Sequence, residues 1–147
     1  MKEMEFLQNL TAQSLCYATK SPDTELYEFG FGSIVESCRL DSPTGKIGTY
    51  ILHVICRFKI IQKTEENQVF RYYEDTPAQK FGSDIQALIG LKVQRVGLSE
   101  KNDLWLDFGN YWVVFATFEN YEESWRLFVA DANAPHLVAS GFWLKFL

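Results

Sequence analysis

Apolar and polar residues alternate most clearly in the C-terminal part of the chain. The stretch Asp103–Phe108 has the period of a strand with one buried face. Gly109 and Asn110 follow, a pair favoured at the two positive-φ positions of a tight β-hairpin. Tyr111–Phe118 returns as a nearly continuous apolar segment, which is typical of a central strand covered on both faces. A third strand over Trp125–Val129 completes a predicted meander.

The same alternation predicts strands before this meander. Tyr50–Ile61 is the longest candidate, because its even positions form an unbroken apolar face. Its odd positions mix isoleucines with His53, Arg57 and Lys59, so this second face is half covered and carries nitrogenous side chains. Val69–Tyr73 is the predicted hairpin partner. Further strands are predicted over Leu26–Phe31, Ile34–Leu40, Lys92–Leu98 and His136–Phe146.

Short helices are predicted at two places. Residues 4–10 carry apolar side chains at helical spacing, and a second helix is expected to begin at a cap formed by Ser83 or Asp84 and to end at Gly90. The segment Asp-Ser-Pro-Thr-Gly at residues 41–45 is typical of a loop. The sequence contains no internal repeat, low-complexity segment or linker.

The composition fits one folded unit. Of the 147 residues 47% are hydrophobic and 22% are charged, which is ordinary for a globular protein, and we expect a single domain over residues 1–147. The predicted fold class is α+β, a largely antiparallel twisted sheet made of hairpins and a meander, with one or two short helices. Aromatic residues reach 16%, and a sheet-rich core explains this content because aromatic side chains favour strands.

The charge and the cysteines restrict the partners and the compartment. The net charge is −5 and the 14 lysines and arginines are scattered, so no nucleic-acid partner is expected. No apolar run approaches the ~20 residues that cross a bilayer, and the N-terminus lacks the apolar core of a secretory signal, so no membrane partner is expected. The odd number of cysteines, Cys16, Cys38 and Cys56, fits free thiols in a reducing cytoplasm better than a disulfide framework.

His53 is the first candidate for chemistry, because imidazole titrates near neutral pH. Arg57 lies further along the same predicted strand face, so the two side chains define a candidate ligand site; a hydrogen-bonded histidine on a half-covered sheet is the alternative. Cys56 has the opposite parity, which argues against a Cys–His nucleophile pair. Metal-ligand spacings, phosphate-binding loops and nucleophile elbows are missing, so no catalytic residue, metal or cofactor is predicted.

Acidic and aromatic residues suggest a second surface. The loop containing Glu119 is rich in glutamate, which is typical of a solvated turn or of a negative patch that attracts a basic partner. Trp105 shares its strand face with aspartates, and exposed aromatics ringed by acids are typical of protein-binding hot spots, although a half-buried tryptophan explains the pattern equally. The predicted partner-binding residues are Trp105, Asp107, Tyr121, Glu122 and Glu123.

Several segments resemble a family of small uncharacterised bacterial proteins. The sequence Leu-His-Val-Ile-Cys-Arg-Phe-Lys-Ile at residues 52–60 is similar to the Leu-His-Val-Gln-Cys-x-Trp-Arg-Leu signature of that family, with Ile55 in place of an amide. The Glu-Phe-Gly segment at 28–30, the alternating segment at 103–108 and Glu-Ser-Trp-Arg-Leu at 123–127 also resemble it. The family implies no established activity. Small α+β bacterial proteins of this kind are similar to immunity proteins that neutralise a toxin domain.

Three interpretations follow. The first is a protein-interaction module, of the immunity type or similar, that binds a basic protein partner through the acidic and aromatic residues. The second is a small-molecule-binding protein or unfamiliar enzyme with its site around His53 and Arg57, which a pocket containing both side chains would favour. The third is a homodimer formed through the aromatic edge. An exposed Trp105 would support the first.

Overall fold

The computed structural model describes residues 2–36, 46–131 and 133–147. Two short helices and a 3-10 turn cover Lys2–Gln8 (α1), Ala78–Asp84 (α2) and Ile85–Leu88 (η1). The strands are β1 (Leu15–Lys20), β2 (Tyr27–Glu36), β3 (Lys46–Val54), β4 (Phe58–Gln62), β5 (Gln68–Tyr72), β6 (Arg95–Leu98), β7 (Leu104–Asp107), β8 (Tyr111–Phe115), β9 (Trp125–Val129), β10 (Leu137–Ala139) and β11 (Leu144–Phe146).

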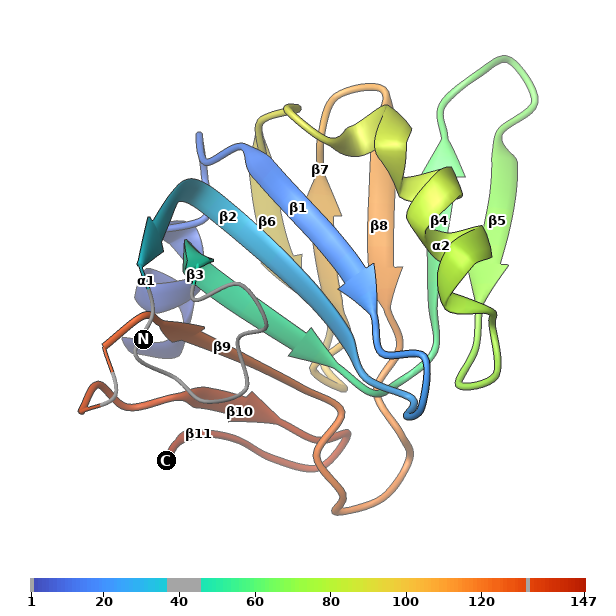
Figure 1. Ribbon diagram of the computed structural model, residues 1–147. Helices are drawn as coiled ribbons and strands as arrows, with labels where there is room; N and C mark the ends of the chain where they lie inside the picture. Colours follow the sequence, from blue (N-terminus) through green and yellow to red (C-terminus); the bar gives the residue numbers. More distant parts are fainter. Residues whose placement is uncertain (1, 37–45, 132) are drawn as a thin grey trace.

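These strands form two antiparallel sheets (Figure 1). The six-stranded sheet has the order β1-β2-β3-β9-β10-β11, and the five-stranded sheet has the order β5-β4-β8-β7-β6. The expected α+β class with antiparallel pairing is therefore confirmed, with two sheets in place of one. The five-stranded sheet uses one continuous part of the chain, whereas the six-stranded sheet joins strands from both ends of the sequence. The two ends of the chain also meet, since the rings of Phe6 and Phe146 lie 5.6 Å apart.

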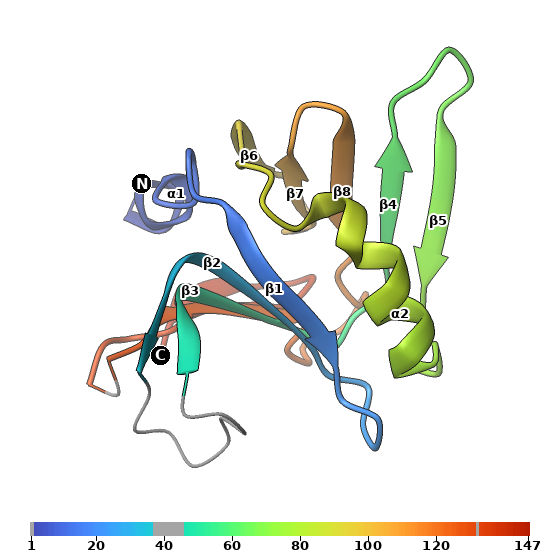
Figure 2. The ribbon, with the colours of Figure 1, turned by 45° about the horizontal axis from the view of Figure 1, so that its top comes forward.

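An aromatic cluster holds the two sheets together. Phe58 of β4 is buried and its ring contacts five other rings at centroid distances from 4.7 to 5.8 Å, those of Tyr27, Phe29, Tyr72, Phe81 and Phe115. Tyr27 and Phe29 belong to the six-stranded sheet, while Phe81 comes from α2. Helix α2 lies between β1 and the β4–β5 hairpin (Figure 2). Each apolar sheet face is thus buried against the other and against this helix.

The single strand predicted over 50–61 is wrong, because the chain changes sheets within it. Strand β3 ends at Val54 and β4 begins at Phe58. The alternation hides the break because Val54 and Phe58 both face the shared core, so the even positions stay buried on either side of it. Backbone hydrogen bonds from Ile55 to the Ser124 carbonyl and from Ala116 to the Arg57 carbonyl fix the crossing.

The predicted hairpin of Asp103–Phe108 and Tyr111–Phe118 is confirmed, with somewhat shorter strands, as β7 and β8. Gly109 has a φ of +95°, whereas Asn110 is not among the described residues with positive φ, so only the first turn position needs the left-handed region. Strand β8 lies centrally between β4 and β7, but its outer face is not covered as expected, since Trp112 is 39% exposed.

Other element predictions are partly correct. The N-terminal helix and the strand at Trp125–Val129 are confirmed, and the strand predicted over 136–146 is the hairpin of β10 and β11. The second helix begins at Ala78 rather than at a Ser83 or Asp84 cap, because Pro77 precedes it and Phe81 anchors it in the core. Strand β1 was not predicted. Cys38 and the predicted loop at 41–45 lie outside the described residues.

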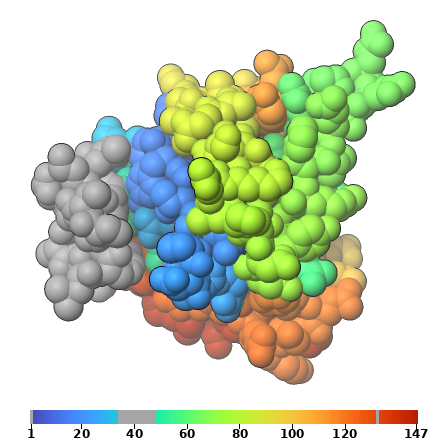
Figure 3. Space-filling model, turned by 45° about the vertical axis from the view of Figure 1, so that its right-hand side comes forward, coloured from blue at the N-terminus to red at the C-terminus, as the bar shows by residue number. Residues whose placement is uncertain are grey.

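The β4–β5 hairpin projects from the body of the molecule. Figure 3 shows its tip, in green, standing away from the rest of the surface. Val69 and Phe70 of β5 are exposed there, and β5 is an edge strand of its sheet.

Trp105 packs flat against Gly97, its cross-strand partner in β6. A Cβ atom at Gly97 would lie 1.9 Å from Trp105 Cζ2, so the glycine is required by this close approach. We expect Gly97→Ala to lower the free energy of unfolding by about 1–3 kcal/mol, since the indole must move. Urea unfolding followed by tryptophan fluorescence measures this.

The matched control is Gly82→Ala in α2, where a Cβ would meet nothing within 4 Å. That change should stabilise by about 0.5–1 kcal/mol, as alanine does in helices. Equal stabilities for Gly97→Ala and the wild type would show that Trp105 is not held against β6.

Candidate functional site

Tyr121 and Phe142 form an exposed aromatic pair at the tips of two loops. Their ring centroids lie 4.8 Å apart in an edge-to-face arrangement, yet the residues remain 75% and 56% exposed. Tyr121 lies in the β8–β9 loop and Phe142 in the β10–β11 loop. The indole N–H of Trp143 donates to the Tyr121 carbonyl at 3.0 Å, so the two loops are tied together.

The loop that carries Tyr121 also contains acidic residues. Glu119 and Glu122 are exposed in the β8–β9 loop, and Glu119 makes only a long, solvent-exposed ion pair with Lys101 at 3.5 Å. Glu123 instead folds back onto Arg126, where it accepts two hydrogen bonds from the guanidinium. We call Glu119, Tyr121, Glu122 and Phe142 the loop patch. Of the predicted partner-binding residues, Tyr121 and Glu122 belong to it, and Glu123 supports its end.

Trp105 and Asp107 lie elsewhere, on the outer face of the five-stranded sheet. Trp105 is half-buried and lines a hollow with Arg95, Trp112 and Val114. The sequence left packing and binding equally open for Trp105, and the structure shows it half-buried against Gly97 of β6. Phe142, which the sequence did not single out, is the residue whose ring contacts Tyr121.

Asp107 is 3% exposed and fully engaged. Its Oδ1 accepts from Lys63 Nζ at 2.9 Å and from the Gly109 N–H at 2.8 Å, and its Oδ2 accepts from Arg95 at 2.8 and 3.1 Å. Burial alone would raise the pKa of this carboxyl, but the hydrogen bonds from Lys63, Gly109 and Arg95 outweigh burial and hold the pKa well below its ordinary value. Asp107 thus fixes the β7–β8 turn and two cations.

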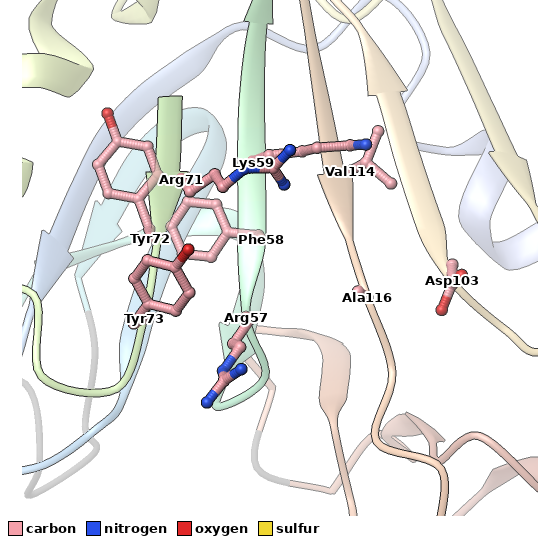
Figure 4. Close-up of a pocket in the computed structure, with 9 residues that line it drawn as sticks. All are labelled: Arg57, Phe58, Lys59, Arg71, Tyr72, Tyr73, Asp103, Val114 and Ala116. Atoms are coloured by element: carbon pink, nitrogen blue, oxygen red, sulfur yellow. The ribbon is translucent and has the colours of Figure 1, made fainter. Parts of the chain in front are cut away.

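A second hollow on the same sheet face contains unpaired cations. It has a volume of about 490 Å³ and is lined by residues that include Arg57, Lys59, Arg71, Tyr73, Asp103 and Val114 (Figure 4). Lys59 of β4 and Arg71 of β5 are directly opposite each other across the strands. Within the described ranges neither side chain has a hydrogen bond or an ion pair with an acid. Like charges in this position destabilise a sheet.

Arg57 also lines this hollow, and its only ion pair among the described residues is a weak one. Its guanidinium lies 5.3 Å from the centroid of the Tyr73 ring and donates to Glu74 at 3.3 and 3.4 Å. Both side chains of this ion pair are more than half exposed to solvent, so the pair is weak. Arg57 therefore adds a third cation to one side of the hollow.

His53 lies on the outer face of the six-stranded sheet, away from the hollow that Arg57 lines. Its Nε2 is 2.6 Å from Glu28 Oε1, and Glu28 Oε2 accepts from the Tyr17 hydroxyl at 2.6 Å. Burial, together with the hydrogen bond to Glu28, raises the pKa of Tyr17 well above its ordinary value. The structure separates His53 from Arg57 because the chain leaves the six-stranded sheet between them. The two side chains of the ligand site predicted around His53 and Arg57 therefore lie in two separate places.

The same outer face holds a second polar group. Arg126, the cross-strand neighbour of His53, lies with its Nη1 2.8 Å from His136 Nδ1. The Phe128 ring stacks on the His136 ring and meets the His53 ring edge-on. This arrangement is a hydrogen-bonded histidine on a covered sheet face, the alternative that the sequence left open for His53.

Cysteine and metal chemistry gain no support from the geometry. Cys56 is buried, and burial raises the pKa of its thiol to about 12, so it stays protonated at neutral pH. The described part of the chain contains no group of three His, Cys, Asp or Glu side chains placed to hold a metal ion. Among the helices of that part, none is long and apolar enough to cross a bilayer.

Comparisons with protein-family models, with curated proteins and with solved structures gave no significant match. The resemblance of residues 52–60 and 123–127 to a bacterial family therefore stays a prediction.

Removing the Asp107 carboxylate should destabilise the protein in a pH-dependent way. We expect Asp107→Asn to cost about 1–3 kcal/mol at pH 7, because Lys63, Arg95 and the turn lose a charged acceptor. A lowered pKa adds stability above the unfolded value of ~3.9 and loses it as pH falls towards the folded value. The deficit should thus shrink below about pH 4.

Urea unfolding at several pH values measures this deficit, with Asp23→Asn in an exposed loop as the control. A deficit for Asp107→Asn that stays constant between pH 7 and pH 3 would contradict the electrostatic origin.

The opposed cations make a further prediction about stability. Arg71→Glu should raise the free energy of unfolding by about 1 kcal/mol at low salt, since an attraction to Lys59 replaces a repulsion. The gain should fall at high salt, where exposed charges are screened. Arg71→Gln should lie between the two proteins. A stability of Arg71→Glu no greater than that of Arg71→Gln at low salt would contradict the prediction.

Proposed function

We propose that this chain is a protein-interaction module that binds a partner with a basic surface through the loop patch. The observation that carries the proposal is the exposed contact between Tyr121 and Phe142. Scattered exposed apolar residues are ordinary, but two large rings in contact on adjacent loops form a continuous apolar patch.

The pair is suited to act as an anchor. Each aromatic side chain can bury ~150–250 Å² in an interface, and tyrosine is enriched at binding hot spots. The edge-to-face contact and the hydrogen bond from Trp143 already hold the loops together. Binding would therefore order little that is not ordered in the free protein.

The charges set the kind of partner. Glu119 and Glu122 are exposed in the same loop as Tyr121, and the whole chain carries a net charge of −5. Such a rim speeds association with a positively charged surface and makes it sensitive to salt. A toxin domain with a basic surface, neutralised by an immunity-type protein, is a partner of this kind; this narrower proposal depends on analogy of fold style.

The test is co-purification from a lysate of the source cells with matched variants. Tyr121→Ser combined with Phe142→Ser should abolish capture of a stoichiometric basic partner, because the anchor is removed while the core is untouched. The control combines Val69→Ser with Phe70→Ser, a second exposed apolar pair on β5. It should retain the partner, and the wild-type complex should dissociate at high salt.

Native mass spectrometry of the captured material gives the composition of each complex. A partner retained by the Tyr121 and Phe142 variant, or lost equally by the control, would contradict the loop patch as the interface. A wild-type chain that forms only a dimer with itself would favour the homodimer instead.

A further inference from the structure

We propose that the 490 Å³ hollow on the outer face of the five-stranded sheet is a binding site for a phosphate monoester, held by Lys59 and Arg71. This site is separate from the loop patch, and none of the residues that define that patch lines it.

Lys59 and Arg71 are placed to contact one anion. They are direct cross-strand partners, and such pairs have Cβ atoms ~4.5–5.5 Å apart on the same sheet face. Figure 4 shows the two side chains extending over the hollow from neighbouring strands. Two cationic heads that repel each other in the free protein can share the oxygens of one bound anion.

Most other cations of the described residues already have an acidic partner. Ion pairs are formed by Arg57, Lys63, Lys80, Arg95, Lys101 and Arg126. Lys59 and Arg71 form none within the same ranges, although they face each other. Their repulsion is a cost of the free protein that a bound anion would remove, as is common where a site is built at the expense of stability.

The number of charges favours phosphate over carboxylate. A phosphate monoester carries about −1.5 to −2 charges at pH 7 and three acceptor oxygens, which match two opposed cations. Arg71 can bind two of those oxygens with its planar fork, and Lys59 can act as a point charge on the third. Arg57, on the same hollow, adds a further cation. A single carboxylate would leave part of this charge uncompensated.

The rest of the hollow positions the ligand. Its volume lies within the ~300–1,000 Å³ of small-molecule sites. Tyr73 offers an aromatic wall, and Val114 and Ala116 an apolar floor. Asp103 lies at the side away from Arg71 (Figure 4), with its Oδ1 bonded to the Thr117 N–H and hydroxyl at 2.8 and 2.9 Å. This carboxylate repels an anion, which places the phosphate at the β4–β5 end.

The first test is a titration of the whole chain with phenyl phosphate at low salt, followed by backbone amide NMR shifts. Saturable shifts on β4 and β5 are expected for the wild type. Lys59→Gln should weaken binding about tenfold or more, and Arg71→Glu should abolish it. Lys92→Gln, which removes an exposed cation outside the hollow, should bind like the wild type.

Arg71→Glu separates binding from folding, because this variant is expected to be more stable than the wild type. Lost binding in a more stable protein cannot come from unfolding. Equal binding of phenyl phosphate by the wild type and Arg71→Glu would overturn the proposal, as would an absence of saturable shifts in the wild type. Benzoate, a monoanion with the same ring, should bind about tenfold more weakly, and equal binding would overturn the assignment to phosphate.

A phosphotyrosine peptide of five residues identifies the source of the phosphate. Tighter binding of this peptide than of phenyl phosphate, lost in Arg71→Glu, supports a phosphorylated protein segment as the natural ligand. Equal affinities support a small phosphorylated molecule. Failure of both probes would overturn this site and leave the loop patch untouched, since the two sets of variants do not overlap.

Discussion

The contacts of the Phe58 ring are the interaction on which the rest of the structure depends. Each sheet has one apolar face, and neither can be buried without the other. Phe58 touches rings from both sheets and from α2, so it marks the place where the three layers meet. Once the inner faces are joined, the outer faces and the loops are left for the charged side chains that form the sites, such as Asp107, Lys59 and Arg71.

The two outer faces differ in how their charged side chains are paired. On the six-stranded sheet, Glu28 joins Tyr17 and His53 in one hydrogen-bonded group. On the five-stranded sheet, Asp107 forms ion pairs with both Lys63 and Arg95, whereas Lys59 and Arg71 oppose each other and form no ion pair within the described ranges. That contrast is the physical reason for assigning a ligand to the second pair.

Local signals in the sequence predicted local structure well. The β7–β8 hairpin follows from strict alternation and from Gly109, and β9 from its compact apolar run. The change of sheet after Val54 could not be predicted, because burial of alternate residues continues across it. The cross-strand pairing of Lys59 with Arg71 could not be predicted either, since a register error of one residue would move one of the two cations to the inner face.

On the candidate surfaces, too, contacts between segments far apart in the sequence could not be predicted. Tyr121 and Glu122 were predicted from the sequence of one loop, but the contact of Phe142 with Tyr121 depends on the β10–β11 hairpin and could not be predicted from it. For Trp105 the sequence left packing and binding open, because its exposure depends on the residue across the strand, here Gly97, and no pattern within β7 itself reveals it. Sequence patterns thus identified candidate residues along the chain, whereas which of these residues lie together depends on the pairing of strands in the tertiary structure.

The arrangement of the strands also has a consequence for how the chain folds. The five-stranded sheet is built from one continuous segment, between the end of β3 at Val54 and the start of β9 at Trp125. Those two residues are cross-strand partners, so their pairing closes a loop that contains the whole smaller sheet. Closing a long unstructured loop is entropically costly and slow. Folding of the inner segment first would bring its two ends together, so the smaller sheet is the natural nucleus for assembly of the larger one.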